Sequence, residues 1–493
     1  MSRDTIATQP EQKEGMFRQL SGFGMPFWMV NIMEMFERLA YYGVRVVIPI
    51  YIAQADQIGG LHFSQSDKGW IFFWWALVQS LVPVFSGGFA DRYGYKKSIA
   101  VSITIKIIGY LMMATMTSYY PFLLGCCVLA AGTAIFKPGV QGTMARCLNK
   151  ENSSVGWGTF YMLVNIGGFL GPPLAHFLYG ISWPAVFFGC AIIVSINYLV
   201  LLTYKEVAAG GDQTGSVMKI IKITLNNIVK PRLAAFVLIM SGFWLMFMQL
   251  FDMLPNFIVD WVDTSRIAAF LGNPSFMTVE TPRGTMITQE WLINSNGGLI
   301  IIAVVLLSWM VARMRRIHSI FLGIIIASIG LILAGYSMSG YFCVIGILVF
   351  TVGEMLASPK MQDYLGIIAP EGEKALYMGY SNIPVAIGWA IGSLMAGNIY
   401  ENMGDKANLA IRYLTERNYF SEPLTGEAFN NFRPEAVIKL QEHLGIDAIE
   451  ATNLLWKTYD PYLLWLPFAG IGIASAIGIF FYARWVKEYE KGV

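Results

Sequence analysis

Long apolar stretches separated by shorter polar connections run through almost the whole chain. A helix needs about 20 mostly apolar residues to cross the hydrocarbon core of a bilayer. Twelve stretches reach that length, so the pattern predicts an all-α integral membrane protein with 12 transmembrane helices. They lie near residues 25–52, 66–89, 98–117, 120–145, 156–178, 181–203, 232–259, 289–312, 317–338, 341–367, 375–399 and 460–484.

A polar stretch at residues 205–231 divides these helices six and six. We expect an N-terminal six-helix bundle at 1–204, a cytoplasmic linker at 205–231 that lies partly on the membrane surface, and a C-terminal six-helix bundle at 232–493. Two long outer segments, near 260–288 and 400–459, belong to the second half. The sequence assigns no chemistry to either of them.

Basic residues gather in the connections on one side of the predicted membrane. Because Lys and Arg are enriched on the cytoplasmic side, this bias sets the orientation. We therefore expect a multi-pass protein of the cell (inner) membrane with both termini in the cytoplasm; Arg266 and Arg283 are exceptions in the outer connections. The basic residues of the inner connections are Arg92, Lys96, Lys97, Lys150, Lys205, Lys219, Lys222, Lys230, Arg313, Arg315, Arg316, Arg484 and Lys487.

The composition agrees with a membrane protein and excludes several other classes. The chain is 55% hydrophobic and 13% charged, against about 25% charged in soluble proteins, and its mean hydropathy is +0.53. A net charge of +2 without a Lys/Arg-rich run does not favour nucleic-acid binding. Five cysteines without CxxC spacing predict neither a metal site nor a disulfide framework. No phosphate loop, HExxH motif or nucleophile elbow is present, so we expect no enzyme and no cofactor.

Four charged residues lie inside the first predicted helix, in "EMFERLAYYGVR". Each charge near a bilayer centre costs roughly 2.5–3.5 kcal/mol. A carboxylate in a low-dielectric cavity holds a proton more readily than one in water, which is what a proton carrier requires. A purely structural buried ion network is the alternative. The residues that share one helical face, and can point into one cavity, are Glu34, Glu37, Arg38, Tyr41 and Arg45.

The connection after the second helix reads "GGFADRYGYKK". A glycine turn followed by Asp91, Arg92 and a basic cluster resembles the signature between helices two and three of the major facilitator superfamily. The resemblance implies the major facilitator fold of two six-helix bundles, which rock around a midplane site, with Asp91 and Arg92 in a cytoplasmic gate. An ordinary positive-inside loop with a glycine turn is the alternative.

The first-helix stretch resembles a more specific signature, "ExxERFxYYG" of the proton-dependent oligopeptide transporters, with Leu39 in place of Phe. Five further stretches resemble motifs of that family in the same order along the chain. They are "GTAIFKPGV" with Lys137, "FYMLVNIGGFLGP" with Asn165, "FWLMFMQ" with Gln249, "INSNGG" with Asn296 and "GEMLASPK" with Glu354.

The resemblance implies a proton-coupled symporter that imports di- or tripeptides, or peptide-like substrates, by alternating access. A peptide is a zwitterion, so its site needs a carboxylate, a cation and amide groups. Glu354 is a candidate for the amino end, Lys137 and Arg45 for the carboxyl end, and Asn165 and Asn296 for the backbone. The remaining substrate-binding candidates are Tyr41, Tyr42, Gln249 and Trp389.

Each of these roles has a structural alternative. Lys137 could pair with Glu34 or Glu37 only to hold the halves together, and Asn165 and Asn296 could serve as interhelical hydrogen-bonding groups. Lys106, inside the third helix, is expected to form an ion pair or to extend toward the interface rather than bind substrate. For His176, near the outer end of the fifth helix, we expect a helix-capping role.

The chain departs from the family pattern at places that bear on function. The seventh helix has Met248 where the family has Glu, and Gly297 stands where it has Pro. Asp252 lies one turn beyond Met248, so we expect it to take over the pairing with Arg45. The proton-coupling candidates are Glu34, Glu37, Arg38, Lys137 and Asp252.

Other functions stay open from the sequence. "GGFLGPP" partly resembles a motif of drug antiporters, relatives of the peptide carriers include carriers of nitrate and other anions, and a non-transporting receptor or scaffold is a third class. The expected partners are protons, a small peptide-like substrate and the lipid bilayer, without nucleic acid. We expect a monomer.

Overall fold

The computed structural model describes residues 20–149, 152–207, 222–223, 226–310, 314–370, 377 and 379–489. The predicted linker falls mostly outside these residues. Within the described part of the chain, twelve helices have membrane-spanning length, which agrees with the predicted number. They are α2 (Met25–Arg45), α4 (Gln65–Tyr93), α5 (Tyr95–Thr115), α6 (Tyr119–Cys147), α7 (Ser153–Tyr179), α8 (Trp183–Leu202), α10 (Pro231–Phe247), α14 (Gln289–Met310), α15 (Arg316–Gly335), α16 (Gly340–Ile368), α18 (Asn382–Met403) and α23 (Trp465–Tyr489).

Eight of the described helical segments are both long and apolar enough to cross a membrane by composition. Only about half of each apolar window is buried inside the protein, so the rest faces outward, where lipid would lie. Helix α2 is not among the eight, and its sequence carries four charged residues. The hydrophobicity of α2 alone therefore does not explain a position inside the membrane. Its charged side chains need partners inside the fold.

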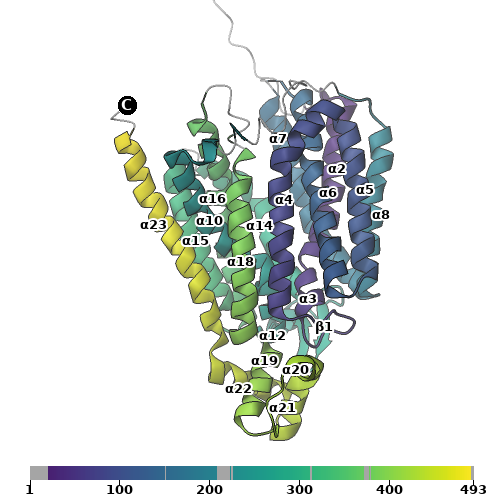
Figure 1. The fold of residues 1–493 in the computed structure, drawn as a ribbon, viewed down its shortest axis with the longest axis vertical. Helices are drawn as coiled ribbons and strands as arrows, with labels where there is room; N and C mark the ends of the chain where they lie inside the picture. The colour runs from purple at the N-terminus through teal and green to yellow at the C-terminus, as the bar shows by residue number, and fades with distance from the viewer. Residues whose placement is uncertain are drawn as a thin grey trace, which may run out of the picture.

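The helices form the two expected bundles, which lie side by side in Figure 1. Helices α2 and α4 to α8 pack together, as do α10, α14, α15, α16, α18 and α23; α4–α18 and α7–α14 contacts join the bundles. Gly69 and Gly397 let α4 and α18 approach closely, because a Cβ added at Gly397 would lie 2.6 Å from the carbonyl oxygen of Gln65. Small residues at such a crossing allow backbone contact inside a membrane.

Two of the membrane helices are interrupted near the end of the molecule that carries residues 400–459, which is called the outer end here after the orientation predicted from the sequence. Helix α2 stops at Arg45 and continues as α3 (Ile48–Ala53), and α10 continues through α11 (Gln249–Asp252) into α12 (Leu254–Trp261). Proline lies in the first turn of both α3 and α12. Because proline lacks the N–H of a regular helix, it favours these breaks. Arg45 and Asp252, which are the last residues of α2 and α11, lie beside the two breaks and pair with each other.

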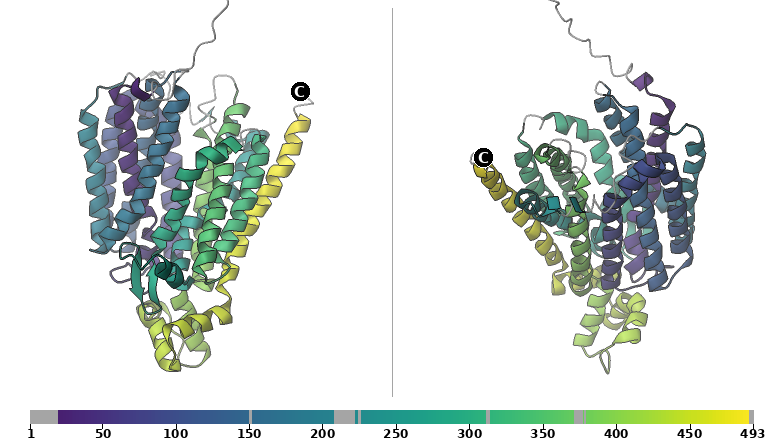
Figure 2. Two further views of the ribbon diagram at one scale, coloured as in Figure 1. Left: turned by 180° about the vertical axis from the view of Figure 1, so that it is seen from behind. Right: turned by 45° about the horizontal axis from the view of Figure 1, so that its top comes forward.

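The two long outer segments are folded. The first contains α13 (Ser265–Phe270) and an antiparallel hairpin of β1 (Thr278–Thr281) and β2 (Gly284–Ile287), in which Thr278 pairs with Ile287. The second, here called the outer unit, lies at the end of the molecule opposite the C-terminus (Figures 1 and 2). Its helices are α19 (Lys406–Glu416), α20 (Gly426–Phe432), η1 (Arg433–Glu435), α21 (Ala436–Leu444) and α22 (Ala448–Tyr459).

Candidate functional site

A cavity of about 440 Å³ lies between the two bundles. This volume is within the range typical of small-molecule sites. Side chains from α2, α6 and α7 line one side, and side chains from α14, α16 and α18 line the other. The predicted residues among those lining it are Arg38, Tyr41, Tyr42, Arg45, Lys137, Asn165, Asn296, Glu354 and Trp389.

Beneath one wall of the cavity, the charges of α2 form a buried ion network. The Nε atom of Arg38 lies 3.2 Å from Oε1 of Glu34, and its guanidinium also pairs with Glu37. Lys106 of α5 lies 3.6 Å from the other Glu37 oxygen. It therefore forms an ion pair, which was one of the two roles expected from the sequence. Because Arg38 lines the cavity while its partners lie behind it, the network presents a cation to the cavity.

Lys137 contributes a second cation from the neighbouring helix α6. Its side chain lines the cavity and interacts electrostatically with Arg38, Glu34 and Glu37. Three cations, Arg38, Lys106 and Lys137, therefore share the two carboxylates Glu34 and Glu37 behind this wall. A proton arriving at either carboxylate would change which cation is neutralised.

The opposite wall carries a carboxylate held in place by hydrogen bonds. The amide nitrogen of Asn296 in α14 donates to Oε2 of Glu354 in α16 at 2.8 Å, and also to Oγ1 of Thr351 at 2.9 Å. Both side chains line the same cavity as Arg38 and Lys137. The cavity therefore has cations on the N-terminal bundle and an oriented carboxylate on the C-terminal bundle.

Arg45 and Asp252 join the two bundles at the outer end of the cavity. They form a buried ion pair, and Arg45 also donates to the carbonyl oxygen of Phe251 at 3.1 Å. The second Asp252 oxygen accepts hydrogen bonds from Ser393 Oγ at 2.6 Å and Trp389 Nε1 at 3.1 Å. Asp252 therefore pairs with Arg45, as the sequence analysis expected, and its part in proton coupling stays a prediction.

Gln249 does not lie where the sequence analysis expected. It is fully buried, its amide donates to the carbonyl oxygen of Leu245 at 2.7 Å, and it is not among the residues that line the cavity. Its neighbours Met248 and Phe251 face the cavity instead. Successive helical residues differ in direction by about 100°, so Gln249 points away, toward α18.

His176 does not act as the expected helix cap, but contacts the other bundle. Its Nδ1 atom lies 2.6 Å from Oε1 of Glu290 at the start of α14, and the hydroxyl of Tyr179 donates to the same oxygen at 2.8 Å. The contact joins α7 and α14 near the outer side. Glu290 itself carried no motif that could have identified it in the sequence.

The predicted gate is only partly described. The side chain of Asp91 lies outside the described residues, while Arg92 is exposed at the end of α4 with its guanidinium 5.6 Å from the ring centre of Tyr93. Their role as a gate stays a prediction.

The outer side of the cavity is closed by a set of polar contacts between the bundles, here called the outer closure. Lys68 Nζ donates to Oδ1 of Asn256 at 2.7 Å, the Asn256 amide donates to Gln54 Oε1 at 3.1 Å, and the Gln54 amide donates to Asp260 at 2.8 Å. These four side chains are almost completely buried. The sequence analysis identified none of these four residues, because none of them lies in a recognised motif.

The outer unit takes part in this closure through Arg433. Its guanidinium pairs with Asp405 at 2.8 Å and donates to the carbonyl oxygen of Phe63, in the loop before α4, at 3.1 Å. Gln65 of α4 donates to the same Asp405 oxygen at 3.0 Å. A residue of the outer unit therefore reaches across to the N-terminal bundle.

Comparison with known protein families gives a match over most of the chain. The model of the Major Facilitator Superfamily matches residues 30–393. Among curated proteins, dipeptide and tripeptide permease B of Aeromonas hydrophila is 30% identical over 171 residues, which is 32% of this chain and 32% of that protein. The permease of the same name from Salmonella typhimurium is 27% identical over 234 residues, 45% of each chain. These matches span about a third to a half of the relatives' length.

Solved structures of similar fold cover nearly all of the chain. A POT family transporter in complex with a thioalcohol-conjugated peptide has a TM-score of 0.67 at 15% identity, covering 93% of this chain and 96% of that one. A POT family transporter in complex with 5-aminolevulinic acid has a TM-score of 0.64 at 15% identity, covering 88% and 96%. At these identities, the likeness establishes the fold.

Proposed function

Because the chain belongs to the major facilitator superfamily and, within it, to the proton-dependent oligopeptide transporter family, we propose that it imports di- and tripeptides or peptide-like substrates by proton symport. The observation that carries this proposal is the shared cavity, with Arg38 and Lys137 on one wall and Glu354 on the other. A zwitterion with an ammonium at one end and a carboxylate at the other matches that charge distribution. The permeases and peptide-bound structures among the relatives support the same substrate class.

The substrate's two ends are bound by opposite bundles in this proposal. Glu354, held by Asn296, accepts hydrogen bonds from the ammonium, and Lys137 and Arg45 bind the carboxylate. Asn165 hydrogen-bonds the peptide backbone, although its amide also donates to the carbonyl oxygen of Tyr161 at 2.7 Å. The aromatic rings of Tyr41, Tyr42 and Trp389 line the space left for side chains.

Proton coupling acts through exchange of ion-pair partners. A proton that neutralises Asp252 removes the attraction to Arg45, which frees Arg45 for the substrate and weakens a contact between the bundles. A proton on Glu34 or Glu37 similarly leaves Arg38 and Lys137 with less compensating charge, which favours binding of the substrate carboxylate. The outer closure must separate for substrate to enter from outside, and then reform before release to the inside.

A carrier of nitrate or another small anion is the second candidate. Among the described residues that line the cavity, three are cations, Arg38, Arg45 and Lys137, and one is a carboxylate, Glu354. An anion without an ammonium would not need Glu354. Replacement of Glu354 by glutamine therefore distinguishes the two substrates.

The experiment is uptake into proteoliposomes under an imposed pH gradient, inside alkaline. Dipeptides, tripeptides, single amino acids and nitrate are compared for the wild-type protein and for Glu354→Gln. We expect accumulation of di- or tripeptides that collapses with a protonophore and is lost in Glu354→Gln. Nitrate uptake that is unaffected by Glu354→Gln, without peptide uptake, would establish the anion carrier instead; binding of peptide without flux would indicate a receptor.

A further inference from the structure

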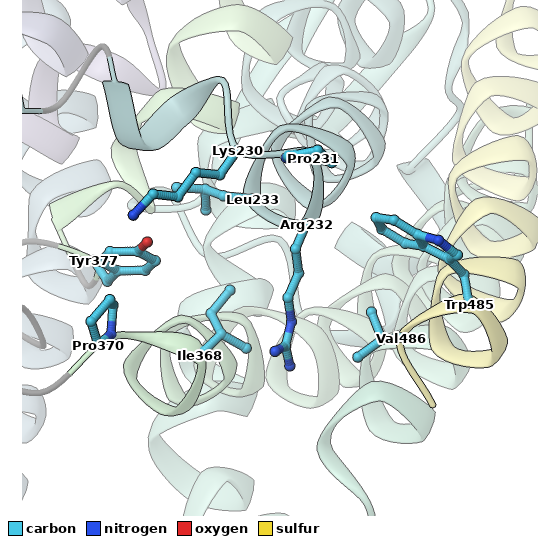
Figure 3. A pocket seen from close by; sticks show the side chains of 9 residues that line it. All are labelled: Lys230, Pro231, Arg232, Leu233, Ile368, Pro370, Tyr377, Trp485 and Val486. Carbon is cyan, nitrogen blue, oxygen red and sulfur yellow. The ribbon is translucent and has the colours of Figure 1, made fainter. Parts of the chain in front are cut away.

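A second cavity, of about 320 Å³, lies at the inner end of the C-terminal bundle (Figure 3). It is formed where α10 begins and where α16 and α23 end. Helix α23 diverges from its neighbours toward this end of the molecule, as Figure 1 shows. None of the residues that line this cavity lines the central one, so it has no place in the proposed transport site.

The charged side chains that the structure describes in this cavity all have the same sign. Lys230 and Arg232 are the two charged side chains among the described residues that line it, and both are cations. In Figure 3 the Arg232 guanidinium extends into the space between the helices, and the Lys230 ammonium extends over Tyr377. A ligand that compensates this charge must be an anion.

Arg232 is held in position rather than free to extend into water. Its guanidinium interacts through hydrogen bonds with the buried hydroxyls of Tyr364 and Tyr482. The Tyr482 hydroxyl also donates to the Arg232 carbonyl oxygen at 3.1 Å and accepts from Tyr364 at 2.9 Å. A guanidinium with a fixed geometry loses less conformational entropy when it binds a phosphate.

The other walls are apolar and aromatic. Leu233, Ile368 and Val486 provide aliphatic surface, and Trp485, whose side chain is 40% exposed, lies on α23 at the outside of the bundle. Tryptophan is enriched where a membrane helix meets the headgroup region. The cavity therefore combines cations with hydrocarbon-like walls at one membrane surface.

We propose that this cavity binds an anionic phospholipid of the inner leaflet, with the lipid phosphate between Lys230 and Arg232. Its acyl chain lies along Leu233, Ile368 and Val486, beside Trp485. Basic pockets between membrane helices on the cytoplasmic side suit anionic headgroups, and the predicted orientation places this cavity there. The site goes beyond the proposed transport function and does not depend on it.

The test uses the purified full-length protein in detergent and measures its unfolding temperature against added ligand. The ligands are dioctanoyl phosphatidylglycerol, dioctanoyl phosphatidylcholine and inorganic phosphate. We expect the phosphatidylglycerol to raise the unfolding temperature, and the other two to leave it unchanged. An equal effect of phosphatidylcholine, or of inorganic phosphate alone, overturns the anionic-lipid site.

Two variants and a matched control locate the binding. Lys230→Gln should weaken phosphatidylglycerol binding about five-fold, and Lys230→Gln with Arg232→Gln more than twenty-fold, since each cation near an anionic surface contributes about 1 kcal/mol. The control is Arg484→Gln, because Arg484 is exposed on the same end of α23, stacks on Phe480 and does not line the cavity. If Arg484→Gln weakens binding as much as Lys230→Gln, the effect is general surface charge and the site is wrong.

Fluorescence gives a readout that does not depend on stability. Phosphatidylglycerol with brominated acyl chains should quench the wild-type protein more than a Trp485→Phe variant, and Lys230→Gln should remove that difference. Quenching that is identical in both proteins contradicts the proposed position of the acyl chain.

Discussion

Arg45 on α2 and Asp252 on α11 form a buried ion pair across the two bundles, at the outer end of the central cavity. Arg45 also lies close to aromatic rings, with its guanidinium carbon 4.8 Å from the ring centre of Phe72 and 5.1 Å from that of Trp389. Because one partner comes from each bundle, the pair must break when the bundles separate on this side. Its charge state can therefore be coupled to the conformational change.

Asp252→Asn should uncouple transport from the proton gradient. Removing one partner of a buried charge pair costs about 2–5 kcal/mol, so gradient-driven peptide uptake should fall by at least about tenfold. Counterflow, in which substrate exchanges without a proton gradient, should continue. Continued counterflow would show that the variant is folded. The control is Glu416→Gln, in an exposed ion pair with Arg412 on the outer unit. Unchanged gradient-driven uptake and pH dependence in Asp252→Asn would rule out this role.

Glu354→Gln should discriminate between substrates with and without a free amino group. A hydrogen bond to a charged group contributes about 1.5–3 kcal/mol, so the apparent affinity for a dipeptide should fall roughly 10- to 100-fold. The same dipeptide with an acetylated amino end should bind the variant and the wild type alike. Competition against a labelled substrate measures both. A similar loss for the acetylated peptide would mean that Glu354 positions other residues instead of meeting the ammonium.

The parts of the site that depend on local spacing could be predicted from the sequence. Arg38, Tyr41 and Arg45 line one cavity because residues three, four and seven apart share a helical face. The prediction that Gln249 lines the cavity was wrong because neighbouring residues on a helix point about 100° apart. Near a helix break, no local sequence pattern shows which of them faces the cavity. The contact of His176 with Glu290 spans 114 residues, and that of Arg433 with Phe63 spans 370, so only the folded chain brings them together.

Lys106→Met should destabilise the N-terminal bundle, although Lys106 does not line the central cavity. Lys106 is completely buried, and its partner Glu37 would lose one of the two cations that form ion pairs with it, which costs up to about 3–5 kcal/mol for a buried pair. The unfolding temperature should drop, and Lys106→Met with Glu37→Gln should recover part of the loss, because the uncompensated carboxylate is gone. Arg412→Gln, in an exposed pair, should change stability by less than about 1 kcal/mol. If the double variant is no more stable than Lys106→Met, the pair does not contribute in this way.

Gly397→Ala should keep the outer side of the protein open. The added Cβ would lie 2.6 Å from the Gln65 carbonyl oxygen, a backbone atom that cannot move aside easily, so α4 and α18 cannot approach. We expect reduced peptide uptake, and faster labelling of a Ser80→Cys reporter in the cavity wall by an impermeant thiol reagent from outside, in a cysteine-free background. Gly470→Ala is the matched control, since nothing lies within 4 Å of the added Cβ. Wild-type labelling and uptake in Gly397→Ala would show that this helix contact is not needed for closure.

Arg433→Ala should weaken the outer closure and thereby assign a role to the outer unit. Arg433 is almost completely buried, pairs with Asp405, and reaches the backbone of the N-terminal bundle at Phe63. Without Arg433, the negative charge of Asp405 is only partly compensated. The contact between the outer unit and the loop before α4 is also lost. The ion pair with Asp405 lies within the C-terminal half, so the closed state specifically loses the hydrogen bond from the guanidinium to Phe63. A hydrogen bond to a charged group contributes about 1.5–3 kcal/mol, so labelling of Ser80→Cys from outside should accelerate by at least about tenfold.

The controls separate this effect from unfolding of the outer unit. Arg417→Ala removes an exposed arginine of the same unit, which lies over the ring of Tyr413, and should label at the wild-type rate. Arg433→Lys should be intermediate, because a single ammonium cannot reproduce the several directed hydrogen bonds of the guanidinium. The core of the outer unit, at Leu440, Ala451 and Leu455, does not include Arg433, so its helix content should be retained. Labelling and uptake that match the wild type in Arg433→Ala would leave the outer unit without a part in closure, and the buried arginine would then serve only to hold α19 and α21 in place.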